Sequence, residues 1–69
     1  MNLTLECEQE DDGRWLAEVL ELPGVMAYGD AASAALSKVQ VLALRVIAER
    51  IENNELTPGT ILITVPAAA

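Results

Sequence analysis

No proline or glycine interrupts residues 31–55, which make up more than a third of this 69-residue chain. Apolar residues recur within this segment at helical spacing, and at about 100° per residue they form one stripe. This pattern predicts a single long amphipathic helix from Ala31 to about Ile51 or Asn53. We expect the Asp30 carboxylate to be its N-cap and Asn53-Asn54 to be its stop. The stripe expected to face a sheet consists of Leu36, Val39, Ala43, Ile47 and Ile51.

The apolar surface of the predicted helix is wider than one small sheet can cover. A helix of about 22 residues is roughly 33 Å long, whereas a strand of about six residues spans about 20 Å. One end of the helix should therefore extend past the sheet and require a second subunit. A symmetric dimer is the expected form of self-association. Its candidate interface comprises Val41, Leu44, Ala48 and Ile51.

Two alternating segments precede the helix and predict a β-hairpin. Leu3, Leu5 and Cys7 alternate with polar residues, and a second alternation begins at Trp15, which we expect to point inward at the edge of the sheet. A two-residue turn would put the apolar rows of the two strands on opposite faces. A three-residue loop pairs Cys7 with Ala17 and unites these rows, so we predict that loop, with Gly13 at positive φ.

The remaining segments complete an α+β arrangement in the order β-β-β-α-β. Leu22-Pro23-Gly24 breaks the chain, and residues 25–29 form a short third strand. Residues 60–65 are β-branched enough for a fourth strand. We therefore predict one domain over residues 1–69, in which the long helix packs on a small, mostly antiparallel sheet.

The net charge of −7 lies entirely in the first thirty residues. Up to Asp30 there are eight acidic residues and one basic residue, Arg14. Beyond Asp30, three basic residues cancel the charge of three acidic ones. A nucleic-acid surface needs Lys and Arg to displace counterions, so this distribution argues against direct nucleic-acid binding. It favours either a solubilising face or a basic protein partner.

The second face of the predicted hairpin is where these charges gather. The chosen register places Glu6 across from Glu18, beside Glu8, Leu16 and Leu20. Like charges directly opposite on a sheet are destabilising. Two interpretations stay open: an ordinary solvated face, or a docking surface for a basic partner with Leu16 and Leu20 as apolar anchors.

The residue types argue against catalysis and bound metals. The chain has no histidine and a single cysteine, Cys7, which excludes the usual zinc sites and the Ser-His and Cys-His nucleophilic systems. We expect Cys7 to act as a small buried hydrophobe, and we predict no cofactor and no enzymatic activity. No apolar run is long enough to span a membrane and the first residues do not resemble a signal peptide, so we expect a cytoplasmic protein.

Three blocks of the sequence resemble the HicB-like antitoxin family. They are residues 10–19 (EDDGRWLAEV), residues 21–25 (ELPGV) and residues 28–30 (YGD). The family pattern has an aromatic-x-A-E-V segment, then D/E-L-P-G, then G-D and an E-A-L helix. The helix start departs from it, because Ala34-Ala35-Leu36 stands where Glu-Ala-Leu is usual.

The resemblance implies a partial ribonuclease H-like layout and a protein-binding role. Members of the family bind and neutralise a HicA-type toxin, a small basic ribonuclease that acts on mRNA, by occluding it. Full-length members commonly carry a DNA-binding module, and because only a short stretch follows the predicted helix, we expect none here. The alternative is a stand-alone oligomeric scaffold or small-ligand binder without a toxin partner.

Overall fold

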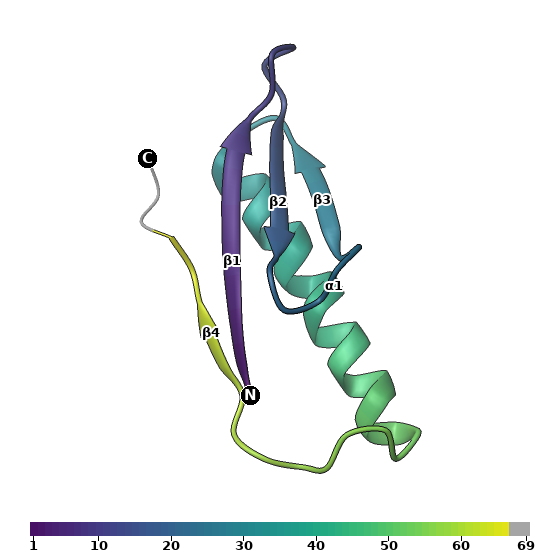
Figure 1. The fold of residues 1–69 in the computed structure, drawn as a ribbon. Helices are drawn as coiled ribbons and strands as arrows, with labels where there is room; N and C mark the ends of the chain where they lie inside the picture. The colour runs from purple at the N-terminus through teal and green to yellow at the C-terminus, as the bar shows by residue number, and fades with distance from the viewer. Residues whose placement is uncertain (67–69) are drawn as a thin grey trace.

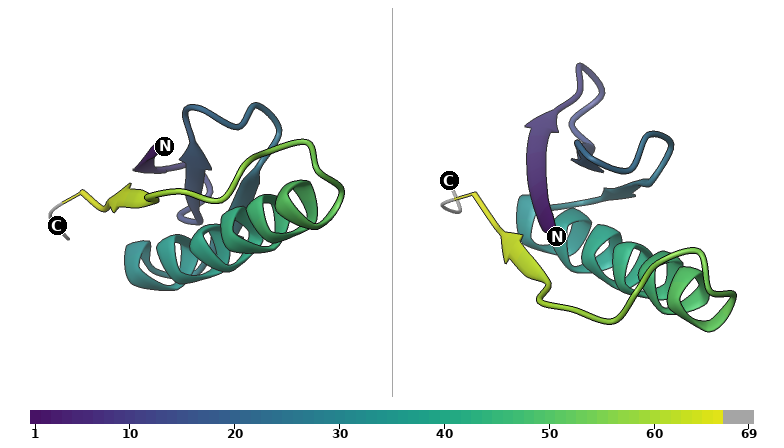
Figure 2. Two further views of the ribbon diagram at one scale, coloured as in Figure 1. Left: turned by 90° about the horizontal axis from the view of Figure 1, so that it is seen from below. Right: turned by 60° about the horizontal axis from the view of Figure 1, so that its bottom comes forward.

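The computed structural model describes residues 1–66, which form one helix and four strands in the predicted order β-β-β-α-β. The sheet has the strand order β3-β2-β1-β4, and α1 lies across one of its faces (Figures 1 and 2). β1 pairs antiparallel with β2, β2 pairs antiparallel with β3, and β1 pairs parallel with β4, so the sheet is mixed. The elements are β1 (Asn2–Gln9), β2 (Trp15–Val19), β3 (Met26–Gly29), α1 (Ala32–Glu52) and β4 (Leu62–Thr64).

The β1–β2 hairpin has the predicted register. Cys7 pairs with Ala17 and Leu5 pairs with Val19, so that the apolar rows of both strands face α1. The loop closes where the backbone N–H of Glu10 donates to the Arg14 carbonyl at 2.7 Å, which leaves three residues in the loop. Gly13 has a φ of +94°, as a three-residue hairpin loop requires.

The connection between β2 and β3 is a tight turn anchored in the core. The N–H of Val25 donates to the Leu22 carbonyl at 3.0 Å, which closes a four-residue turn around Pro23 and Gly24. Gly24 has a φ of +88°, which the third position of a type II turn requires. The Leu22 side chain is buried, so this turn belongs to the core.

The core lies between α1 and the covered face of the sheet. The predicted inward residues of both hairpin strands are buried there, and Trp15 is half-buried and packed against them. Trp15 therefore points inward as predicted, although it stands at the end of an internal strand. The buried core residues are Leu3, Leu5, Ala17, Val19, Leu22, Ala35, Leu36, Val39, Ala43 and Ile47.

The predicted N-cap of the helix is wrong by one residue. Ala31 is the N-cap, with φ −140° and ψ 157°, and no side chain within the described residues caps α1 there. Asp30 is exposed one position earlier. Gly29 lies close to the first turn of α1, because a Cβ at that position would lie only 2.6 Å from the backbone nitrogen of Ala35. The close packing of β3 against this turn is a tertiary constraint at the helix start.

The predicted helix stop is confirmed and has the hydrogen bonds of a Schellman motif. Asn54 adopts a φ of +59° just after the helix. The N–H of Glu55 donates to the Arg50 carbonyl at 2.8 Å, and the N–H of Asn54 donates to the Ile51 carbonyl at 3.1 Å. These bonds satisfy carbonyl groups that the last turn would otherwise leave unpaired.

The last turns of α1 extend past the ends of β2 and β3, as the lengths predicted (Figure 1). Ile47 is buried, whereas Arg50, less than one turn later and close to the same side of the helix, is exposed. The chain then returns to form β4 beside β1, where Leu3 pairs with Ile63. In the part of the chain that the structure describes, α1 is not long and apolar enough to cross a membrane.

Candidate functional site

The face of the sheet opposite α1 gathers all five residues predicted to form a docking surface. The register places Glu6 directly across from Glu18, and Glu8 across from Leu16. Leu20 continues this pairing one position beyond β2, since its N–H donates to the Thr4 carbonyl at 3.0 Å. No other element covers this face among residues 1–66 (Figure 2). These side chains therefore share one surface, which points away from the helix that the sheet packs on.

The third strand adds two residues to this surface that the sequence analysis did not identify. Met26 pairs with Glu18, and Tyr28 pairs with Leu16. Met26 is 44 % exposed and Tyr28 is 40 % exposed, large fractions for such apolar side chains. Met26 and Tyr28 alternate with Ala27 and Gly29 in the sequence, and this alternation could have predicted that they share one face of the sheet. We call the complete surface the open face, comprising Glu6, Glu8, Leu16, Glu18, Leu20, Met26 and Tyr28.

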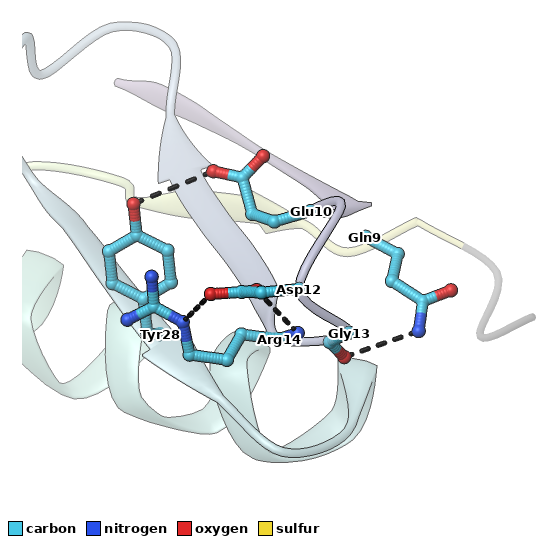
Figure 3. Close-up of polar contacts among 6 residues, drawn as sticks. All are labelled: Gln9, Glu10, Asp12, Gly13, Arg14 and Tyr28. Atoms are coloured by element: carbon cyan, nitrogen blue, oxygen red, sulfur yellow. Dashed lines mark hydrogen bonds and ion pairs between the residues drawn. The ribbon is translucent and has the colours of Figure 1, made fainter.

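Tyr28 is held at one end of the open face by residues of the hairpin loop (Figure 3). The Arg14 guanidinium lies 4.3 Å from the centre of the Tyr28 ring, within the range of a cation–π interaction. Arg14 is itself fixed, because its Nε is 2.8 Å from Asp12 Oδ2 and its backbone N–H donates to Asp12 Oδ1 at 3.0 Å. The Tyr28 hydroxyl donates to Glu10 Oε1 at 3.5 Å. The ring is therefore held in place by contacts within the chain.

The contacts between Arg14 and Asp12 also affect the pKa of the Asp12 carboxyl. The backbone and side-chain hydrogen bonds from Arg14 lower the pKa of Asp12 below its ordinary value. A second bond stiffens the loop from the other side, where Gln9 Nε2 donates to the Gly13 carbonyl at 3.2 Å (Figure 3). The loop is an ion-paired support for Tyr28.

A shallow, open hollow of about 290 Å³ lies along β1, between the acidic half of the open face and Pro66. Three glutamates and one leucine are among the residues that line it. Such a surface can attract cations and cover apolar groups, but it does not enclose a substrate. The lining residues are Glu6, Cys7, Glu8, Leu16, Glu18 and Pro66.

Cys7 belongs to the opposite, core side of β1. The thiol is half-buried and donates to the Ala32 carbonyl at a Sγ–O distance of 3.9 Å. Burial raises the pKa of Cys7, so the thiol stays protonated and is a poor nucleophile. Within residues 1–66, no group of three or more His, Cys, Asp or Glu side chains is placed to hold a metal ion.

The residues predicted for self-association lie on α1. Val41 is 47 % exposed, Leu44 is 44 % exposed, and Ala48 is also exposed. Ile51 differs, because it is half-buried and packed against the core. The helix thus presents an apolar surface that the sheet of the same chain does not cover.

Comparisons with known proteins give no relative for this chain. No protein-family model, no curated protein and no solved structure matches it.

Proposed function

We propose that this protein binds a small basic protein through the open face and acts as an antitoxin-like module for a HicA-type mRNA-cleaving toxin. One observation carries the proposal: three glutamates and several large apolar side chains share a single sheet face that no element covers among residues 1–66. The HicB-like sequence blocks described above supply the identity of the partner class. The mixed sheet with one packed helix is compatible with the layout that this resemblance implies.

The charge of the open face selects the partner. Glu6, Glu8 and Glu18 form an anionic cluster on a chain whose net charge is −7. Such a surface repels the phosphates of RNA and DNA, and it speeds the approach of a basic protein through long-range attraction. The proposed partner is therefore a cationic protein surface.

The apolar residues of the open face supply the short-range part of binding. Tyr28 and Met26 are of the types enriched in protein interfaces, and Leu16 lies between Tyr28 and Glu8 in the register. Tyr28 is already held by Arg14, so that little side-chain freedom is lost on binding. The acidic residues would steer the partner, and this apolar group would hold it.

The proposed action is occlusion. The open face carries carboxylates, aliphatic side chains and one phenol, and the Cys7 thiol faces the core instead. Binding would cover the basic surface with which the toxin holds its RNA. The proposal requires no reaction by the antitoxin itself.

The experiment begins with the reading frames adjacent to this gene. A short basic protein containing histidine, if encoded there, is expressed alone and together with the present chain. We expect it to arrest growth and cleave mRNA alone, and co-expression to relieve both effects. Binding between the two purified proteins is then measured at low and high salt, and we expect affinity to fall as salt rises.

Two matched variants test whether the open face is responsible. Glu18→Lys reverses a charge at the centre of the open face, whereas Glu55→Lys makes the same change at an exposed position after α1. We expect the first to weaken binding at least roughly tenfold and the second to have little effect. The absence of any toxic neighbour, or equal effects of the two variants, would favour a stand-alone scaffold or small-ligand binder.

A further inference from the structure

The side of α1 that points away from the sheet carries a second stripe of small and apolar residues, which meets the core stripe at Ile51. Its residues are spaced three and four apart in strict alternation, which is the a/d spacing of a coiled coil. Surface helices of globular proteins are normally polar on this side. We call this stripe the seam, and it comprises Ala34, Ser37, Val41, Leu44, Ala48 and Ile51.

The seam is exposed where its largest central side chains lie. Val41 and Leu44 are nearly half exposed, and Ser37 and Ala48 on either side of them are small and exposed. From Ala34 to Ile51 the seam is about 26 Å long at 1.5 Å per residue. This length is sufficient for a continuous helix–helix contact.

The order of residues along the seam is complementary to itself in the reversed direction. A two-fold axis between positions 42 and 43 would place Val41 against Leu44 of a second copy, and Ser37 against Ala48 of that copy. The same axis would place the small Ala34 against the larger Ile51. The central layers are then filled by exposed side chains, and the small Ser37–Ala48 pair allows the two helices to approach closely. The Ala34–Ile51 layers at the two ends use side chains that are half-buried in their own chain.

Charged residues flank the seam on one side, where Lys38 and Arg45 precede Glu49 and Glu52. In an antiparallel pair, equal flanks of the two helices meet, and the two-fold axis puts Lys38 of one copy level with position 47 of the other, midway between Arg45 and Glu49. The Lys38 ammonium already donates to the Tyr28 carbonyl of its own chain at 3.2 Å. The antiparallel orientation therefore rests on the order of residues along the seam.

The distribution of charge over the chain favours self-association through α1 over self-association through the open face. The residues beyond position 30 carry no net charge, whereas the open face of the sheet is acidic. Two copies that met through their open faces would bring carboxylates together, and a contact through α1 avoids this repulsion.

We propose that α1 packs antiparallel against α1 of a second copy through the seam. The dimer then carries its two open faces on its outer sides, where both are accessible. This inference concerns self-association and stands whether or not the partner of the open face is a toxin.

Sedimentation equilibrium of the full chain tests the dimer and its surface. Val41→Glu and Leu44→Glu place a carboxylate in the seam, and we expect each to raise the dimer dissociation constant at least roughly tenfold. Leu42→Glu is the matched control, since Leu42 is 38 % exposed on the same helix but lies outside the seam. Circular dichroism establishes that each variant is folded. A wild-type protein that stays monomeric at every concentration, or seam variants that dimerise as well as the control, would overturn the proposal.

Disulfide formation tests the orientation without relying on a disruptive variant. In a Cys7→Ala background, one chain carries Ser37→Cys and another carries Ala48→Cys. In the antiparallel seam, position 37 of one copy lies beside position 48 of the other. The two copies of position 37, and likewise those of position 48, are about 16 Å apart along the helix axis. We expect a cross-link only when the two chains are mixed, because a disulfide needs Cα atoms within about 7 Å. Efficient cross-linking of either chain with itself would indicate a parallel pair and contradict the proposal.

Discussion

Glu21 holds Thr4 with both oxygens of its carboxylate. The backbone N–H of Thr4 donates to Glu21 Oε1 at 2.6 Å, and the Thr4 hydroxyl donates to Glu21 Oε2 at 2.7 Å. The pairing of β2 with β1 ends at this point, just after Leu20 donates to the Thr4 carbonyl. The carboxylate therefore replaces the backbone acceptor that the departing strand no longer provides. This contact gives the acidic residue before Leu22-Pro23-Gly24 a structural role, beside Thr4 at the end of the open face.

The Glu21 contact predicts a component of stability that depends on pH. The hydrogen bonds from the backbone and side chain of Thr4 lower the pKa of Glu21 below its ordinary value. A lowered pKa in the folded state stabilises the fold at pH values above about 4.3, the ordinary pKa of a glutamate, and this stabilisation is lost as the pH falls further. We expect Glu21→Gln to be less stable than wild type at neutral pH, with a difference that shrinks toward about pH 3.

Urea unfolding of both proteins between about pH 7 and pH 3 measures this difference. Glu55→Gln is the control, because it removes the same charge from an exposed position outside the sheet. A stability difference between wild type and Glu21→Gln that does not change with pH would contradict the assigned role of the carboxylate.

Gly29 is predicted to tolerate no side chain. A Cβ there would lie 2.6 Å from the Ala35 nitrogen and 3.1 Å from the Ala34 Cβ, and the backbone of the first helical turn cannot move away without shifting α1. We expect Gly29→Ala to destabilise the protein by about 1–3 kcal/mol, as overpacking of a core does. Gly59→Ala provides the comparison, since nothing lies within 4 Å of a Cβ at that position. Equal urea midpoints for the two variants would show that the contact does not constrain the helix.

The hairpin register could be predicted from sequence because only one pairing is compatible with a common core. Leu5 and Val19 must face the same side, and this condition fixes the loop length and the positive φ of Gly13. The same pairing then placed Glu6 opposite Glu18 on the open face. Burial of one face makes a register specific, since a shift of one residue would turn every side chain to the other face.

The start of α1 could not be predicted in the same way. Asp30 has the residue type of an N-cap, but Ala31 is the N-cap, next to the close approach of Gly29 to the first turn. This close approach of β3 to the helix is tertiary packing, which a local pattern does not contain. The parallel pairing of β4 with β1 is also a tertiary choice, and it makes the sheet mixed. Tyr28 and Met26 belong to the open face because β3 pairs with β2, and the sequence pattern alone does not contain this pairing.

Gly13 is predicted to be required for its backbone conformation alone. Its φ of +94° is strained for residues with a side chain, whereas nothing lies within 4 Å of a Cβ built there. We expect Gly13→Ala to cost about 1–2 kcal/mol in the free energy of unfolding, and Gly13→Asn to cost less, because asparagine tolerates the left-handed region better. Thermal unfolding of both variants measures the order, and an alanine variant that is more stable than the asparagine variant would contradict this explanation.

The last prediction concerns the direct opposition of Glu6 and Glu18. Two carboxylates that face each other across adjacent strands repel, so either Glu6→Gln or Glu18→Gln should raise the stability by up to about 0.5 kcal/mol at low salt. The double variant should gain less than the sum of the two, because the first substitution already removes this repulsion. High salt should reduce all three effects, since both side chains contact solvent and their repulsion is screened. A double-mutant cycle at two salt concentrations measures the coupling. Additive changes that do not depend on salt would mean that the pair does not interact. A measured coupling would instead show that the fold retains an unfavourable charge pair on its open face.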